Sequence, residues 1–462
     1  MPQIPTPPNL TQGDGAQLPT GPARPSVDFM AEARKAFDAA DSSGRSEKVD
    51  ALRRRAFAAF EVHGLPRKDA ARRLRESWKY TDVQKTLRQG FPFAPETEHR
   101  LVQADLDAFL VPDLDAHLAV VVNGRYADAL STWGDLPAGV TVEGLQEALK
   151  DYPELVEPHL GRYLDVESDP FAALNTAFDL DGLFVHVPKG VTVERPIYVL
   201  HVTDVDGPAF VQSRSLIVVE ENAEATVFEG QHVTTDQPTF GNHAVEAWVG
   251  QSARFKHAVL QMEGDENRQV RSMQIVQDKD SVASTFTFTL GGGLVRNHLG
   301  LLPGAPNCET HLLGLYAAVG NEHVDNATSV DHAAPGCMSN ELYKGVVKDQ
   351  ALAVFNGRVL VRREGQQTNA YQQSAAVVLS EGARSYAKPE LEIYADDVKC
   401  SHGSATGSLD DEALFYLRAR GIGQEAAEAL LLQAFFGEVL TEIPNEPLRE
   451  HVAGLITKKL GA

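Results

Sequence analysis

Apolar residues recur at helical spacing near the start of the chain. Between residues 46 and 64 they lie mostly three or four positions apart, at Val49, Leu52, Ala56, Ala59 and Phe60, as on one face of an α-helix. Ser46 is suited to cap the start of this helix, and Gly64 to end it. A basic segment from Asp69 to Arg75 continues the helical pattern. We therefore expect a small helical domain in this part of the chain.

The pattern changes to short β-branched runs in the middle of the chain, such as Leu183–Val187 and Ser215–Val219. Short polar turns followed by one small apolar residue recur there, and the small residues are Ala223, Ala253, Val282, Val324, Ala351 and Ala383. Their successive spacings are 30, 29, 42, 27 and 32 residues. A period near 30 without helices between the strands predicts a β-solenoid, in which stacked coils bury one continuous core. A jelly roll or a β-sandwich remains an alternative, because the repeat is degenerate.

Helical spacing returns at the C-terminal end. Ser408 with Asp411 three residues later is similar to a capping box, and Gly421 is suited to end the first helix. Pro444 ends a second amphipathic run, and Leu448, Val452, Leu455, Ile456 and Leu460 form the apolar face of a third. We interpret these apolar faces as core rather than as a groove for a partner.

These patterns divide the chain into five parts. Residues 1–25 are a proline-rich leader, predicted to be disordered. Residues 26–112 form an N-terminal helical domain, residues 113–170 a mixed connecting segment, residues 171–407 the β core, and residues 408–462 a C-terminal helical domain.

Composition narrows the function classes. A net charge of −22 argues against a nucleic-acid partner. No apolar run approaches the length of a membrane span and no secretory signal pattern is present, so we expect a cytoplasmic protein without a membrane partner. The three cysteines, Cys308, Cys337 and Cys400, are too few for a disulfide framework, and they cannot complete a four-thiolate cluster alone.

The usual motifs of ATPases and hydrolases are missing from the sequence. The glycine-rich segment from Gly291 to Asn297 lacks the lysine of a phosphate loop, and no zinc-protease helix or nucleophile elbow occurs. We therefore expect a protein that is not itself an enzyme. Any energy from ATP would come through a partner.

Cys400 and His402 are the strongest candidates for chemistry. They stand two residues apart in a segment with the pattern of a β-strand, so both side chains should share one face, with Lys399 and Ser401 on the other. A thiolate and a neutral imidazole are both ligands for iron, but two ligands leave a site half filled. A site shared with a second protein fits better. The alternative is a structural cysteine beside a surface histidine.

Two other sets of residues are weaker candidates. Asp396 and Asp397 suggest the paired acids of a carbohydrate-active enzyme, but neighbours in a strand point to opposite faces and cannot flank one bond. A loose group of donors has spacings that match no compact metal site: His298, His311, His323, His332, Cys308 and Cys337. We interpret most of these as turn or surface residues.

The chain resembles the SufB/SufD family of scaffold proteins for iron–sulfur cluster assembly. The resemblance covers nearly the whole chain after the leader and is carried by Trp78-Lys-Tyr-Thr81, Val122-Asn-Gly124, Leu174-Asn175, Val354-Phe-Asn-Gly357, the segment from Leu391 to Gly403 and the segment from Leu414 to Ile422. The SufB branch would show a Glu-His-Glu-type motif and more cysteines. The sequence Cys400-Ser-His-Gly403 and the low cysteine count are more similar to the SufD branch. The proline-rich leader is longer than the family pattern.

The resemblance implies a right-handed parallel β-helix flanked by helical N- and C-terminal domains. It implies a heterodimer with SufB through the β-helices, and a SufC ATPase bound through the C-terminal helices. On this basis the partner-binding residues would be Leu414, Phe415, Tyr416, Arg418 and Arg420. His402 would be the iron-site residue at the SufB interface, with Cys400 a secondary contributor.

The resemblance also implies which cofactors and further partners to expect. The cargo would be a transient iron–sulfur cluster, or iron, shared with SufB, and nothing is expected to be bound tightly by this chain alone. A reduced flavin in the complex and a homodimer of the isolated chain are compatible with the family. A cysteine desulfurase system would act indirectly, through SufB. The alternatives are a purely structural subunit without a metal ligand, and a β-helix carbohydrate-active enzyme.

Overall fold

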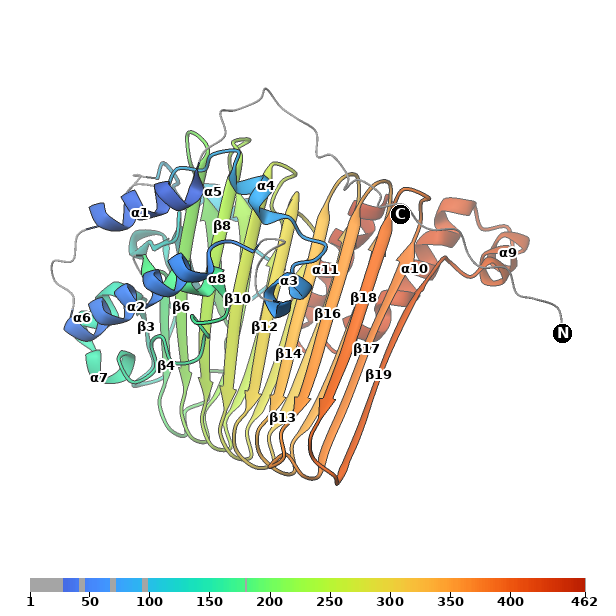
Figure 1. Ribbon diagram of the computed structural model, residues 1–462. Helices are drawn as coiled ribbons and strands as arrows, with labels where there is room; N and C mark the ends of the chain where they lie inside the picture. The colour runs from blue at the N-terminus through green and yellow to red at the C-terminus, as the bar shows by residue number, and fades with distance from the viewer. Residues whose placement is uncertain (1–27, 41–45, 67–71, 94–98, 179–180, 462) are drawn as a thin grey trace.

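The structure is a computed structural model, which describes residues 28–40, 46–66, 72–93, 99–178 and 181–461. The predicted proline-rich leader lies outside the described residues, and so does the start of the basic segment at Asp69. Most of the described chain forms two long sheets that face each other, with helices at both ends of the sequence (Figure 1).

The strands alternate between the two sheets along the chain. The ten-stranded sheet contains, in spatial order, β19 (Val398–Gly407), β17 (Thr368–Val378), β15 (Met338–Val347), β13 (Glu309–Ala318), β11 (Val282–Thr289), β9 (Arg254–Gln261), β7 (Glu224–Val233), β5 (Ile197–Thr203), β1 (His117–Val122) and β2 (Arg125–Tyr126). The nine-stranded sheet contains β18 (Arg384–Ile393), β16 (Leu352–Val361), β14 (His323–His332), β12 (Leu294–Pro303), β10 (Asn267–Gln277), β8 (Thr239–Val249), β6 (Ala209–Val219), β4 (Leu183–Val187) and β3 (Thr141–Gly144). From β4 to β19 every described pairing is parallel, which makes the core a parallel β-solenoid, as the repeat predicted.

The irregular spacing of the small apolar residues follows from this two-sheet coil. Ala223, Ala253 and Val282 stand at the start of strands of the ten-stranded sheet, whereas Val324, Ala351 and Ala383 stand at the start of strands of the nine-stranded sheet. The interval of 42 residues therefore spans one coil plus the half coil that separates the two sheets. In the ten-stranded sheet, the corner position is the one just before a strand begins, where Ala223 and Ala253 precede β7 and β9. Cys308 and Cys337 occupy this position before β13 and β15.

Inside the coils, aromatic rings lie against glycines of the neighbouring strand. Tyr316 is paired in register with Gly345, and Gly314 is paired with Tyr343. A Cβ atom added at Gly345 would lie 1.9 Å from ring atoms of Tyr316, and one at Gly314 would lie 2.2 Å from the ring of Tyr343. Each glycine thus provides the space for one buried ring.

The N-terminal helices cover the outer face of the nine-stranded sheet (Figure 1). They are α1 (Phe29–Ala39), α2 (Glu47–His63), α3 (Arg72–Ser77) and α4 (Val83–Leu87). Ser46 caps α2 through a bond that its hydroxyl accepts from Val49 N, and Gly64 ends it with a φ of 62°, as predicted. Phenylalanines from the helices and the sheet, including Phe57, Phe171 and Phe240, form one shared cluster.

The connecting segment continues the two sheets. Its strand β1 pairs in parallel with β5, and β3 pairs antiparallel with β4. Two short helices precede this segment, α5 (Gln103–Leu106) and η1 (Asp107–Phe109). Within it lie η2 (Asp128–Leu130), α6 (Leu145–Asp151) and α7 (Pro153–Val156), and α8 (Pro170–Ala177) follows at its end. A buried ion pair fixes the loop before α8, because Glu246 accepts from Arg214 at 2.6 Å and from Gly161 N and Tyr163 N at 2.7 Å.

The C-terminal helices are α9 (Asp411–Ala419), α10 (Gln424–Leu440) and α11 (Glu446–Leu460). Helices α10 and α11 lie on the opposite side, against the outer face of the ten-stranded sheet, whereas α9 contributes no buried residue (Figure 1). Apolar residues of α10 and α11, such as Phe436 and Val452, are buried in one cluster with sheet residues, so the interpretation of these faces as core is confirmed. The predicted cap at Ser408 is wrong, because Asp410 accepts the capping bonds from Glu412 N and Ala413 N. Among the described helices, none is long and apolar enough to cross a membrane.

Candidate functional site

The last coil of the solenoid carries the predicted site. Strands β18 and β19 stand at the ends of the two sheets, and each pairs with a described strand on one side only. The second edge of each strand therefore presents backbone N–H and C=O groups that another strand can pair with. The segment from Pro389 to Gly403 contains parts of both strands, separated by a turn after Ile393.

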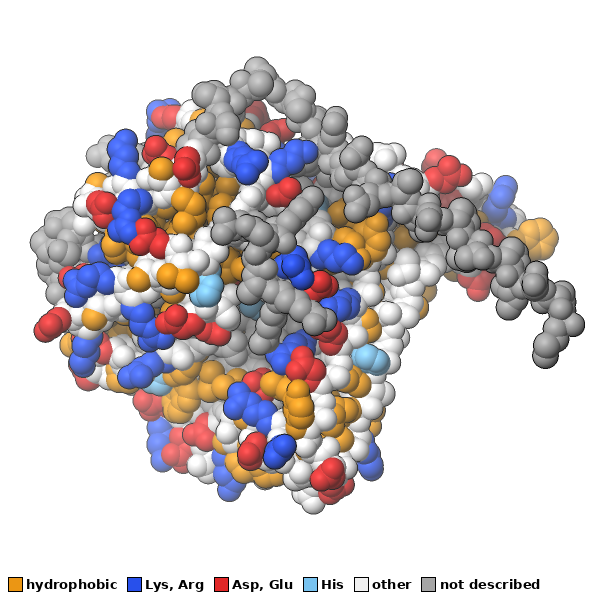
Figure 2. Space-filling view, viewed as in Figure 1, with side chains coloured by type: hydrophobic (Ala, Val, Ile, Leu, Met, Phe, Trp, Pro, Cys, Tyr) orange, Lys and Arg blue, Asp and Glu red, His pale blue; other side chains and the backbone are white. Residues whose placement is uncertain are grey.

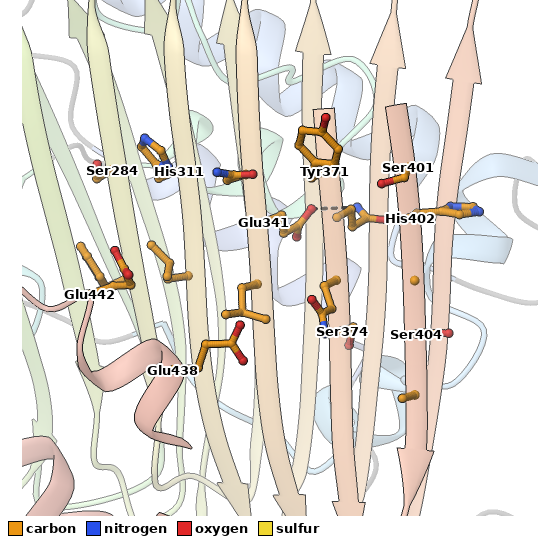
Figure 3. Close-up of a pocket in the computed structure, with 18 of the residues that line it drawn as sticks. Ser284, His311, Glu341, Tyr371, Ser374, Ser401, His402, Ser404, Glu438 and Glu442 are labelled. Atoms are coloured by element: carbon orange, nitrogen blue, oxygen red, sulfur yellow. Dashed lines mark hydrogen bonds between the residues drawn. The ribbon is translucent and has the colours of Figure 1, made fainter. Parts of the chain in front are cut away.

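Cys400 and His402 lie on one face of β19, as their spacing predicts. In the parallel register Cys400 pairs with Ala370 and His402 pairs with Gln372, and both partners are buried. Ser401 pairs with Tyr371, which is exposed on the outer face. Figure 3 shows Ser401 and His402 pointing to different sides of the last strand. Cys400 and His402 thus lie on the face of β19 that is directed towards the interior of the solenoid.

The two side chains differ in their surroundings. Cys400 is half-buried in a small apolar cluster with Val359, Val361 and Ala370. This burial raises the pKa of the Cys400 thiol, so the thiol is held in its protonated form. His402 is exposed. The imidazole is consequently the more available ligand of the two.

No complete metal centre occurs among the residues that the structure describes, because no group of three or more His, Cys, Asp or Glu side chains comes together in a suitable way. The pair on β19 therefore supplies two candidate metal ligands, without a third of these residue types beside them among the described residues.

The other weak candidates are arranged differently from the sequence interpretation. All four histidines of this group lie on strands, so their assignment to turns is wrong. The side chains of His298 and His311 are partly exposed, at 44% and 25%, as a surface position predicts. His332 is fully buried, with its Nε2 2.9 Å from Ser339 Oγ, so a surface position is wrong for this residue. Asp396 and Asp397 lie in the bend between β18 and β19 rather than within a strand.

The stacked corner cysteines form a pair that the sequence did not reveal. Cys308 and Cys337 are buried in one cluster, and both thiols are directed at the carbonyl oxygen of Ala305, at 3.0 and 3.3 Å. The hydrogen bond between the two thiols lowers the pKa of Cys337 and raises the pKa of Cys308. Both residues lie far along the sequence from Cys400, and in separate clusters from it.

A groove runs along the outer face of the ten-stranded sheet next to the last coil. It has a volume of about 850 Å³, and Lys256, His311, Tyr371, His402, Glu438 and Glu442 are among its lining residues. Figure 3 shows that α10 and the following turn supply Glu438 and Glu442 at its side.

Helix α9 contains the second predicted functional segment. It projects from the body of the protein, and hydrophobic side chains are visible on it (Figure 2). Phe415 is 74% exposed and Tyr416 57% exposed, and Arg418 and Arg420 are also exposed, whereas Leu414 is half-buried. Arg420 lies over the ring of Tyr416 with its guanidinium carbon 5.0 Å from the ring centroid.

Taken together, these features define a class of protein. It is a parallel β-solenoid with an open C-terminal edge, two candidate iron ligands on that edge, and a projecting helix with exposed aromatic residues.

Comparison with known proteins identifies the family. Residues 28–199 match the SufBD protein N-terminal region, and residues 201–435 match the SufBD core domain of SUF system FeS cluster assembly. The chain belongs to the SufBD family of iron–sulfur cluster assembly proteins.

Individual relatives agree with this assignment. An iron–sulfur cluster assembly SufBD family protein of Synechocystis is 33% identical over 81% of this chain and 84% of its own length. Iron-sulfur cluster assembly protein SufD of Escherichia coli is 28% identical over 89% of this chain and 95% of its own length. The chloroplastic protein ABCI7 of Arabidopsis thaliana is 30% identical over 73% of both chains. The expected resemblance to the SufD branch is thus confirmed.

Proposed function

We propose that this chain is a non-catalytic, SufD-like scaffold subunit for iron–sulfur cluster assembly, which supplies half of an iron or nascent-cluster site at its contact with a SufB-type partner. The observation that carries the proposal is the position of Cys400 and His402 on β19, a strand with one unpaired edge. A partner strand that pairs with this edge would bring its own side chains next to His402.

Within this site His402 is the principal ligand and Cys400 a secondary one. The exposed imidazole can bind iron directly, whereas burial of Cys400 raises the pKa of its thiol and opposes formation of the thiolate. The iron or cluster is cargo that is shared across the interface and then passed on.

Helix α9 is the docking site for a SufC-type ATPase in this proposal. Exposed aromatic residues flanked by arginine are common among the residues that dominate binding energy in protein interfaces. Phe415, Tyr416, Arg418 and Arg420 provide such a set on a helix that contributes no buried residue of its own.

The experiment is cluster formation in the assembled complex of this chain with its SufB-type and SufC-type partners. We expect His402→Ala to reduce the cluster formed strongly. Ser401→Ala, on the opposite face of the same strand, should leave it unchanged. Wild-type cluster formation by the His402 variant would refute the ligand role.

A purely structural subunit is the second candidate. The apolar packing of Cys400 supports it, because a half-buried thiol in such a cluster fits a structural role. In that case a Cys400→Ala/His402→Ala double variant keeps full assembly activity, while deletion of residues 409–462 still abolishes ATPase binding. The structure does not support the carbohydrate-enzyme alternative, since Asp396 and Asp397 are exposed in the bend before β19 and neither lines the groove beside the last coil.

A further inference from the structure

Gln372 lies directly beneath His402 in the stack of coils. The two residues are paired in register on adjacent parallel strands, whose backbones are about 4.8 Å apart. Gln372 is 3% exposed, so its amide lies inside the solenoid under the exposed imidazole. Stacked amide and imidazole side chains at this separation are within hydrogen-bonding reach of each other.

One end of the Gln372 amide is fixed from the next coil. Its Nε2 donates to Glu341 Oε2 at 2.7 Å, and this bond is the dashed line at Glu341 in Figure 3. Glu341 Oε1 in turn accepts from Thr328 Oγ1 at 2.5 Å. Across the interior, Gly357 leaves the space for this arrangement, because a Cβ there would lie 2.4 Å from Gln372 Nε2. The orientation of the amide is therefore set by its neighbours.

The other end of the amide has no partner. Gln372 Oε1 is buried and accepts no hydrogen bond within the described part of the chain. Buried acceptors in native proteins are nearly always satisfied, so this oxygen is available to accept a hydrogen bond from a group at the open end of the solenoid.

We propose that Gln372 is a positioning residue for the site: its Oε1 accepts a hydrogen bond from a ring N–H of His402 when cargo is bound, which leaves the second ring nitrogen free as the ligand. This inference rests on the proposed function. Metal-bound histidines usually donate their other ring N–H to a carbonyl or carboxylate, and this contact fixes the tautomer and the direction of the ring.

Glu341 acts one step further from the site. It holds the Gln372 amide with Nε2 towards the interior, so that Oε1 is the atom left for His402. Burial raises the pKa of Glu341 to about 7, and the neutral amide separates this carboxyl group from the imidazole.

The test uses Co²⁺ as a spectroscopic probe of the histidine site in the complex of the full chain with its SufB-type partner. Gln372→Leu should raise the dissociation constant for Co²⁺ roughly 10- to 100-fold and change the visible ligand-field spectrum. Gln372→Glu keeps an acceptor oxygen at this position, and a proton held by one of the two carboxyl groups replaces the bond to Glu341, whose pKa burial raises to about 7, so this variant should stay close to the wild type below pH 7. If the leucine variant does not assemble with the partner, Gln372→Met, which is unbranched and of similar length, replaces it.

His402→Ala in the same titration separates the two hypotheses. Weak binding by this variant combined with wild-type affinity and spectrum for Gln372→Leu would overturn the positioning role alone. Wild-type Co²⁺ binding by the His402 variant would overturn the ligand role and the positioning role together. Weak binding by both, with recovery in Gln372→Glu, is the result that we expect.

Discussion

The guanidinium carbon of Arg296 lies 4.0 Å from the centroid of the Trp78 ring. Arg296 is also paired with Asp325, and Thr81 donates to the same carboxylate. Arg296 and Asp325 belong to the outer face of the nine-stranded sheet, whereas Trp78 and Thr81 belong to the N-terminal helical layer. The motif Trp78-Lys-Tyr-Thr81 therefore joins this layer to the solenoid. Tyr80 extends the contact towards the last coil, since its ring stacks on Tyr386 of β18.

Removal of the guanidinium should destabilise the protein. In Arg296→Met the buried Asp325 loses its charged partner, and such a loss costs about 3–5 kcal/mol. Urea unfolding measures this change. The double variant Arg296→Met/Asp325→Leu should recover much of the free energy of unfolding, because no uncompensated charge remains. Equal stability of the single and double variants would contradict this account.

An exposed ion pair provides the matched control. Arg362 binds Asp331 at 2.7 Å, but its side chain is half exposed. Arg362→Met should change the free energy of unfolding by no more than about 1 kcal/mol, since exposed pairs contribute little.

A methyl group added inside the coils should be poorly tolerated. Gly345→Ala places a Cβ against the buried ring of Tyr316, and overpacking of this kind costs about 1–3 kcal/mol. Gly403→Ala in β19 has open space around the added atom and should leave thermal unfolding nearly unchanged. A comparable loss of stability in both variants would show that the strand, rather than the ring, disfavours alanine.

Glu263 should make the free energy of unfolding decrease as the pH rises. Burial raises the pKa of this carboxyl group to about 8, whereas the unfolded chain releases its proton near pH 4.5. Between these values the folded state holds the proton and the unfolded state does not, so this group lowers the free energy of unfolding as pH rises, by up to about 1.4 kcal/mol per pH unit.

Glu263→Gln removes this contribution. We expect the glutamine variant to gain stability over the wild type as the pH rises from 4.5 to 8, and the difference to level off above pH 8. Urea unfolding at several pH values measures it. Glu266→Gln, at a largely exposed side chain three residues away, should show no such trend. A constant difference for the Glu263 variant would refute the prediction.

The exposed aromatic residues of α9 should matter for binding and little for folding. The Phe415→Ala/Tyr416→Ala variant should unfold close to the wild-type temperature, because the side chains contribute little buried surface. Its affinity for the SufC-type ATPase should fall at least about 30-fold, as at an interface hot spot. Leu430→Ala tests another exposed apolar residue on α10 and should bind normally. Calorimetry on both variants measures the unfolding temperature and the affinity for the ATPase.

The strand pattern predicted the solenoid because each coil repeats the same corner, although the degenerate repeat left a jelly roll or a β-sandwich as alternatives. Ala223 and Ala253 mark this corner in the sequence, and their buried side chains show why a small residue is required there. The same pattern put Cys400 and His402 on one face, which the register of β17 and β19 confirms.

Contacts between residues distant in the sequence could not be predicted in this way. Gln372 and Glu341 are 31 positions apart and meet only because one coil separates them. Their residue types are common on polar surfaces, so nothing in the local pattern marks them as buried. The contact between the Trp78 ring and the Arg296 guanidinium could not be predicted either, because it also joins residues that are distant in the sequence.

The parallel coils also have a consequence for the dimensions of the molecule. Each coil advances the sheet by about 4.8 Å, so the number of coils fixes the distance from the first strand of the solenoid, β4, to the open edge. An inserted or deleted coil of about 30 residues would preserve every ladder contact on either side of it. It would nevertheless displace His402 relative to everything anchored at the other end. The number of coils therefore determines the position of a shared site as much as any single side chain does.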